Sequence, residues 1–94
     1  MLDTRLNKRM REVPARCFLR GQEAKVFNTS VGGALVEKVL GDVQVSEKIM
    51  AEFRFPNGGT IEIESVVLRV QERSIALKFV KESPELMEKL KEAA

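Results

Sequence analysis

The sequence has no histidine and only one cysteine, Cys17, among its 94 residues. Histidine and cysteine are the side chains from which most zinc sites in proteins are built, so the usual zinc sites are excluded. Histidine is also the commonest general base of enzymes, and no pair of lysine or carboxylate side chains stands out in its place. We therefore expect a protein that is not an enzyme and needs neither a metal nor a cofactor.

A single cysteine excludes an internal disulfide and is typical of a reducing compartment. Long apolar runs are missing as well, because the apolar residues are dispersed in stretches too short to cross a membrane. The N-terminal segment MLDTRLNKRMRE is charged and lacks the apolar part of a secretory signal. The sequence thus predicts a cytoplasmic protein without membrane insertion. A chain of this length closes a single core, so we expect residues 1–94 to form one domain.

Positive charge is concentrated at the start of the chain, although the net charge is only +2. The small total argues against a protein that coats nucleic acid. The basic residues near the N-terminus are Arg5, Lys8, Arg9, Arg11, Arg16 and Arg20. Residues 1–12 are polar and have little apolar surface to bury. We expect them to form an arm that is mobile without a ligand and ordered by binding.

Apolar and polar residues alternate with the period of β-strands between residues 13 and 81. Glycine, proline and polar clusters interrupt this alternation and mark turns. The strands predicted in this way cover residues 13–20, 24–28, 34–37, 48–55, 61–70 and 75–79. The turn at 29–33 contains two glycines, which permit backbone conformations that other residues rarely adopt.

The connection PNGG at 56–59 contains an Asn-Gly pair, which is a strong signal for a tight hairpin. In the strand that follows, the apolar residues change phase after Ser65, so that Val66, Leu68 and Val70 become the apolar set. A bulge near Ser65, or burial of both faces, would explain this change, and bulges are common where a sheet curls into a barrel.

A helix is predicted over residues 83–93. Ser83 is a capping residue, Pro84 suits the first helical position, and Glu85 adds an acid to the first turn. The apolar residues that share one face of this helix are Leu86, Met87 and Leu90. We expect this face to pack over the strands.

Two short patterns remain as candidates for function: Arg5-Leu-Asn-Lys-Arg9, and Asn28 to Gly33 with Ser30 between them. Taken alone, each has an ordinary explanation, because a charge run is usually solvated and Asn, Ser and Gly are common turn residues. Arginine forks, however, suit phosphate oxygens or the O6 and N7 edge of guanine. The amide and hydroxyl groups of the second pattern can meet another base edge. Together the two patterns describe a clamp for a guanine nucleotide.

With both patterns present, the sequence resembles the PilZ domains, which are bacterial receptors for cyclic di-GMP. The signature of that family is RxxxR followed by [D/N]xSxxG, and Arg5, Arg9, Asn28, Ser30 and Gly33 fill its positions. The flanking segments are also similar to the family, from VPARCFL and GALVE to the FRFPNGGTIEIE hairpin, IALKFV and SPELMEKL. The resemblance covers nearly the whole chain.

The resemblance implies a mostly β fold, with a six-stranded antiparallel barrel over residues 13–81 and a C-terminal helix over 83–93. It implies that Arg5 and Arg9 reach the guanine and phosphates of cyclic di-GMP, while the second motif holds the ligand from the barrel side. It further implies a receptor that signals by changing its interaction with a downstream protein, which the sequence does not identify.

The motif leaves two questions open: which arginine is its second one, and how many ligands one domain binds. Arg11 lies close to the first strand and could take the place of Arg9, so Arg11 and Lys8 are further candidates for the site. Thr4 stands where PilZ domains that bind a stacked ligand dimer often have a basic residue, which favours one ligand per domain.

Two other classes of function compete with the receptor. One is a PilZ-like interaction module, of the kind used in type IV pilus assembly, that binds no nucleotide. The other is a small barrel that binds RNA or single-stranded DNA, which the modest net charge and the few outward aromatic residues disfavour. Intact motif halves favour the receptor, and we expect no DNA or RNA partner.

Overall fold

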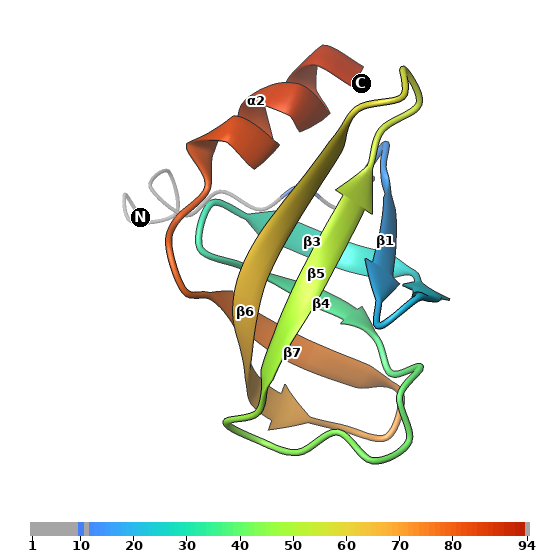
Figure 1. The fold of residues 1–94 in the computed structure, drawn as a ribbon, viewed down its shortest axis with the longest axis vertical. Helices are drawn as coiled ribbons and strands as arrows, with labels where there is room; N and C mark the ends of the chain where they lie inside the picture. The colour runs from blue at the N-terminus through green and yellow to red at the C-terminus, as the bar shows by residue number, and fades with distance from the viewer. Residues whose placement is uncertain (1–9, 11, 94) are drawn as a thin grey trace.

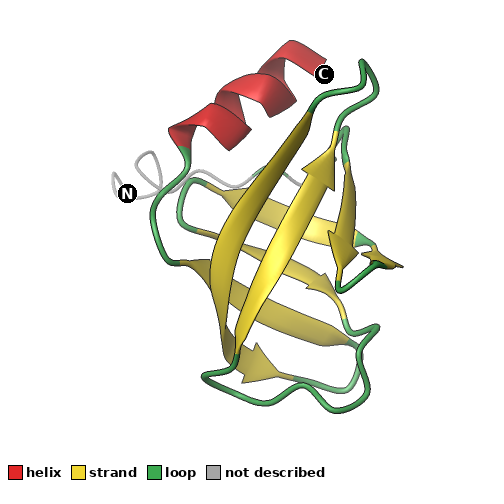
Figure 2. Cartoon of the chain, viewed as in Figure 1, coloured by secondary structure: helices red, strands yellow, loops and turns green. Residues whose placement is uncertain are grey.

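The alternating sequence produces an antiparallel β-structure with one C-terminal helix (Figures 1 and 2). The computed structural model describes residues 10 and 12–93 of the chain. Its elements are β1 (Arg16–Leu19), β2 (Gln22–Ala24), β3 (Val26–Ser30), β4 (Gly33–Glu37), β5 (Lys48–Arg54), β6 (Thr60–Val70), β7 (Ser74–Phe79) and α2 (Pro84–Ala93).

All strand pairs are antiparallel, and the strands lie in the order β2-β1-β5-β6-β7-β4-β3. The two edge strands, β2 and β3, follow each other directly in the chain, so the sheet curls round until its edges approach (Figure 1). The result is a nearly closed barrel with a seam beside β2 and β3. The predicted barrel and C-terminal helix are confirmed, although the described residues form seven strands and not six.

The core is built from the inward residues of the predicted alternation. On β5, Ile49, Ala51 and Phe53 are buried, and the ring of Phe53 meets that of Phe79 edge to face at a centroid distance of 6.4 Å. Burial of each large side chain of this kind stabilises a fold by about 1.5–3 kcal/mol. Cys17 belongs to the same core, and its burial raises the pKa of its thiol to about 12. The thiol is therefore neutral and is a packing group.

The predicted strand 24–28 is divided between two strands. β2 ends at Ala24 and β3 begins at Val26, so Lys25 is the corner at which the chain passes from one edge of the sheet to the other. The backbone of Lys25 is held there by Glu37, whose N–H donates to the Lys25 carbonyl at 2.8 Å and whose carboxylate accepts from the Lys25 N–H at 3.1 Å. The split accounts for the additional strand.

The predicted turn 29–33 is shorter than expected. Thr29 and Ser30 belong to β3 and Gly33 belongs to β4, which leaves only residues 31 and 32 outside the strands. Thr29 is fully buried, and its hydroxyl donates a hydrogen bond to the Gly33 carbonyl at 3.0 Å. This contact across the strand pair extends the ladder into the segment that the sequence assigned to a turn.

The predicted phase change in β6 is wrong. Ser65 and Val67 are buried, and Leu68 is 54% exposed, so the inward phase set by Ile63 continues past Ser65. Ser65 fits the core because its hydroxyl donates to the Ile63 carbonyl at 3.1 Å, which satisfies the buried polar group. The bulge lies further along, where the pairing with β7 shifts between Val67 and Arg69.

The hairpin predicted at PNGG is present, with a longer connection than the tight two-residue form. The Phe55 N–H donates to the Gly59 carbonyl at 2.8 Å, and the Gly58 N–H donates to the Phe55 carbonyl at 2.9 Å. Gly58 alone takes a positive φ, of 99°, while the Asn57 side chain accepts from the Gly59 N–H at 3.2 Å. This is the three-residue hairpin loop in which a left-handed glycine forms the bulge.

The helix α2 begins as the sequence predicts and lies across one end of the barrel (Figure 2). Its first residue is Pro84, and the Leu86 N–H donates to the Ser83 hydroxyl at 3.3 Å, which is the N-cap interaction. Leu86 and Leu90 are fully buried in the common core, with Met87 packed partly against it. The helix therefore closes the barrel with its apolar face.

Loss of this cap gives a test that separates the fold from the site. Ser83→Ala should lower the free energy of unfolding by about 1 kcal/mol, because one N–H of the first turn loses its acceptor. The affinity for any ligand should change little. Chemical denaturation followed by circular dichroism measures the first quantity, and titration of the variant measures the second. A large loss of affinity would mean that α2 takes part in binding.

Candidate functional site

The structure describes one half of the candidate site. Asn28 and Ser30 lie on β3, and Gly33 is the first residue of β4. The other candidates, Arg5, Lys8, Arg9 and Arg11, lie outside the described residues, and so does all of the arm except positions 10 and 12. Their roles and the expected mobility of the arm stay predictions.

A β-bulge turns Asn28 towards the outside of the barrel. Val26 pairs with Val36, and the next partners are Asn28 and Leu35, so Phe27 is the extra residue. Regular pairing would have set Phe27 opposite Leu35 and turned Asn28 inward with the buried Ala34. Bulges are known to re-aim side chains in this way. The motif amide therefore owes its outward position to the bulge.

Asn28 begins a row of outward residues that crosses four strands. Asn28 pairs with Leu35 on β4, Leu35 pairs with Ala76 on β7, and Ala76 pairs with Arg69 on β6. Direct cross-strand partners share one face of a sheet, and the neighbours of Leu35 and Ala76 in sequence are buried inside the barrel. The row thus has an amide at one end, a guanidinium at the other and apolar side chains between them.

A second row runs beside the first, two residues along on β3, β4 and β7 and three residues along on β6, where the bulge adds one. Ser30 pairs with Gly33, Gly33 pairs with Lys78 on β7, and Lys78 pairs with Val66 on β6, which pairs in turn with Lys48 on β5. Ser30 is only 3% exposed, whereas Lys78 is exposed. The two rows bring the motif residues of β3 and β4 to the same face as the cations of β6 and β7.

A pocket of about 320 Å³ lies over the first row. Its lining residues are Asn28, Ala34, Leu35, Leu68, Arg69, Ala76 and Leu77. The volume is at the lower end of the range for small-molecule sites, which are mostly apolar with a few placed polar groups. An apolar floor between an amide and a guanidinium can hold a flat ring system against the barrel and an anionic group at the cationic end.

Gly33 has a packing role in the barrel. A Cβ atom added at this position would lie 2.4 Å from the carbonyl oxygen of Leu77, on the neighbouring strand β7. Such a distance is shorter than any van der Waals contact, so a larger residue requires the backbone of β4 or β7 to move. The missing side chain at Gly33 is thus explained by the close approach of the protein's own backbone.

Thr29, between the two polar residues of the motif, connects β3 to the N-terminal segment. The Met10 N–H donates to the Thr29 carbonyl at 2.7 Å, and the Thr29 N–H donates to the Met10 carbonyl at 3.0 Å. Met10 directly follows Arg9 in the sequence. The segment that contains RxxxR is therefore joined to the barrel at the strand that contains NxSxxG. No local pattern in the sequence predicts this pairing, because it links residues that are distant in the chain.

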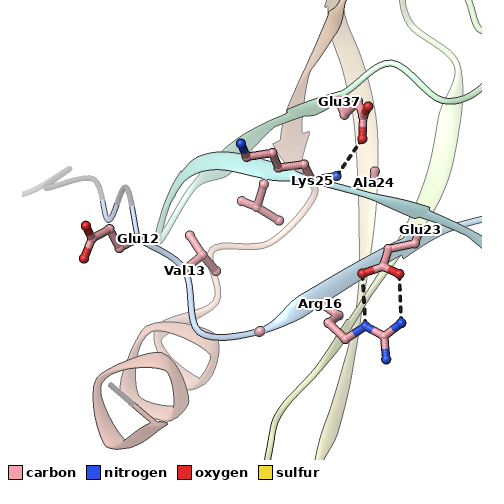
Figure 3. A pocket seen from close by; sticks show the side chains of 9 residues that line it. Glu12, Val13, Arg16, Glu23, Ala24, Lys25 and Glu37 are labelled. Atoms are coloured by element: carbon pink, nitrogen blue, oxygen red, sulfur yellow. Dashed lines mark hydrogen bonds and ion pairs between the residues drawn. The ribbon is translucent and has the colours of Figure 1, made fainter.

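A larger pocket, of about 710 Å³, lies along the seam of the barrel (Figure 3). Its charged residues are Glu12, Arg16, Glu23, Lys25 and Glu37. Arg16 donates two hydrogen bonds to Glu23, at 2.8 and 3.0 Å, and this pairing lowers the pKa of the Glu23 carboxyl. Three carboxylates against two cations disfavour an anionic ligand, and none of the described motif residues lines this pocket. The smaller pocket is therefore the better candidate.

Within residues 10 and 12–93, no group of three or more His, Cys, Asp or Glu side chains is arranged to hold a metal ion. None of the described helical residues form a helix long and apolar enough to cross a membrane.

The sequence reasoning missed Arg69 and Lys78 as members of this surface. Neither residue belongs to the two motifs, and Arg69 lies in the part of β6 where the predicted phase is wrong. The neighbours of both residues are set by strand pairing and by a bulge. Strand pairing and bulges leave no local signal in the sequence.

Comparison with known proteins gives a likeness of fold. No protein-family model matches the chain, and a search of curated proteins found no significant relative. Among solved structures, the chain is similar to an uncharacterized protein from Legionella, with a TM-score of 0.65 and 20% sequence identity. The likeness covers 87% of this chain and 84% of that chain. At this level of identity it supports the barrel fold alone.

Proposed function

We propose that the protein is a cyclic di-GMP receptor of the PilZ type, which binds the dinucleotide through Arg5, Arg9, Asn28 and Ser30. The observation that supports this most is the backbone pairing of Met10 with Thr29. It joins the segment that contains the first motif half to the strand that contains the second, although the two are separated by β1 and β2 in sequence. A clamp formed by both halves requires such a junction.

The chemistry of the outer face supports the same proposal. An amide side chain such as that of Asn28 can both donate to and accept from a base edge, and the pocket beside it has an apolar floor that suits a flat ring. Arginine is the side chain best suited to phosphate and to the O6 and N7 edge of guanine, and RxxxR provides two of them. Binding changes this exposed face, and a downstream protein that contacts it would sense the change.

Stabilisation by ligand tests the proposal. Cyclic di-GMP at about a hundredfold its dissociation constant should raise the free energy of unfolding by about 2.7 kcal/mol. Cyclic di-AMP is the matched control, because it has the same phosphates without the guanine edge, and it should stabilise the protein much less. A short single-stranded RNA tests the nucleic-acid alternative in the same assay.

The three outcomes separate the three classes of function. Stabilisation by cyclic di-GMP alone supports the receptor. Equal stabilisation by both dinucleotides, or by RNA, would contradict guanine recognition. A folded protein that none of the three stabilises would favour the interaction module that binds no nucleotide.

A further inference from the structure

We infer that Arg69 and Lys78 form a second, barrel-side anion site that binds the phosphates of the dinucleotide, in addition to the contacts proposed for the N-terminal arginines. This inference rests on the proposed function, since it concerns the same ligand. It assigns a binding role to two residues outside the RxxxR and NxSxxG motifs.

Arg69 reaches this face because of the bulge in β6. Val67 pairs with Leu77, and both are buried, while the next partners are Arg69 and Ala76. Regular pairing would set Leu68 opposite Ala76 and turn Arg69 inward beside the buried Ile75. The bulge makes Leu68 the extra residue and turns the guanidinium outward.

The two bulges act on the same row. One turns Asn28 outward on β3, and the other turns Arg69 outward on β6, so that each is in register with the strand pair between them. Bulges are over-represented beside functional sites, where they re-aim a side chain. Two independent irregularities that place polar groups at both ends of one pocket indicate a ligand that spans the pocket.

The length of the row suits a dinucleotide. Asn28 and Arg69 are separated by three strand spacings, β3 to β4, β4 to β7 and β7 to β6, which amount to about 14 Å along the sheet. A mononucleotide has a single base, and its phosphate is attached close to that base. A cyclic dinucleotide has two of each, so a guanine beside Asn28 leaves phosphate oxygens for the cations further along the face.

Lys78 completes the cationic side. It pairs with Gly33, which has no side chain to cover the adjacent surface, and it lies two residues along β7 from Ala76, which belongs to the row of Arg69. Among the described residues, neither Arg69 nor Lys78 forms an ion pair, whereas Arg16, Arg20 and Arg54 are each paired with a glutamate. None of the residues that line the pocket is acidic. Both cations are therefore available to an anion.

The test compares three variants, each of which removes one positive charge. Arg69→Gln and Lys78→Gln should each weaken cyclic di-GMP binding by about tenfold, because each loses a charge-assisted contact. Both should also reduce the dependence of the dissociation constant on salt. Arg73→Gln removes the same charge from the exposed connection between β6 and β7, and its affinity should remain within about twofold of the parent. Thermal denaturation should show that all three variants fold like the parent.

The outcomes distinguish this inference from the function on which it rests. If the parent binds cyclic di-GMP and both variants bind as tightly as Arg73→Gln, the barrel-side anion site is overturned and the receptor stands. If the folded parent binds no cyclic di-GMP, the proposed function fails and the anion site fails with it.

Discussion

Replacement of Arg5 or Arg9 by alanine is expected to weaken cyclic di-GMP binding by at least about tenfold. Each arginine is proposed to make charge-assisted hydrogen bonds to phosphate or guanine, and loss of such a bond commonly costs about 1.5–3 kcal/mol. The barrel should stay folded in both variants, because its buried core is formed by other residues. Calorimetric titration measures the affinity, and thermal denaturation checks the fold.

Two further variants serve as controls for the assignment of the motif. Arg11→Ala should weaken binding less than Arg9→Ala, since Arg11 is expected to contribute mainly long-range charge that salt screens. Ser30→Ala should also weaken binding by less, because a neutral hydroxyl makes a weaker contact than a guanidinium. A larger loss for Arg11→Ala would show that the register of the motif is wrong. Binding like the parent in all four variants would refute the receptor hypothesis.

Gly33→Ala is expected to lower the free energy of unfolding by about 1–3 kcal/mol, the usual cost of forcing extra volume into a packed site. The added methyl group would lie 2.4 Å from the Leu77 carbonyl oxygen, so β4 or β7 must shift. Because Asn28 and Lys78 are held by these strands, we also expect weaker ligand binding. Chemical denaturation measures the first effect.

The neighbouring glycine is a matched control for this prediction. A Cβ atom added at Gly32 would meet no atom within 4 Å, so Gly32→Ala should change stability by no more than about 0.5 kcal/mol. If Gly33→Ala is as stable as Gly32→Ala, the close contact with Leu77 does not prevent a larger side chain at position 33. The glycine of the motif would then have to be explained by the ligand.

The sequence predicted those parts of the fold that depend on local signals. Ser83 and Pro84 mark the start of α2 because capping involves only the first turn of a helix. The alternation of β5 predicted its buried residues because one face of the strand meets the core. The inward phase of β6 was predicted wrongly at Ser65. A serine counts as polar in any hydrophobic pattern, whereas Ser65 is buried with its hydroxyl bonded to the Ile63 carbonyl.

In the candidate site, too, only the features with a local sequence signal were predicted. The motif pattern identified Asn28, Ser30 and Gly33, because their spacing is a property of the sequence. It did not predict Arg69 or the pairing of Met10 with β3, which depend on the register between strands that are distant in the chain. Register and bulges follow from the packing of the whole barrel, so no short pattern contains them.

Calorimetric titration of the full chain with cyclic di-GMP is the decisive experiment, because it measures ligand identity, affinity and stoichiometry together. We expect saturable binding of one cyclic di-GMP per chain, weakened in Arg9→Ala. A protein that is folded by circular dichroism and yet takes up no cyclic di-GMP would contradict the proposed function.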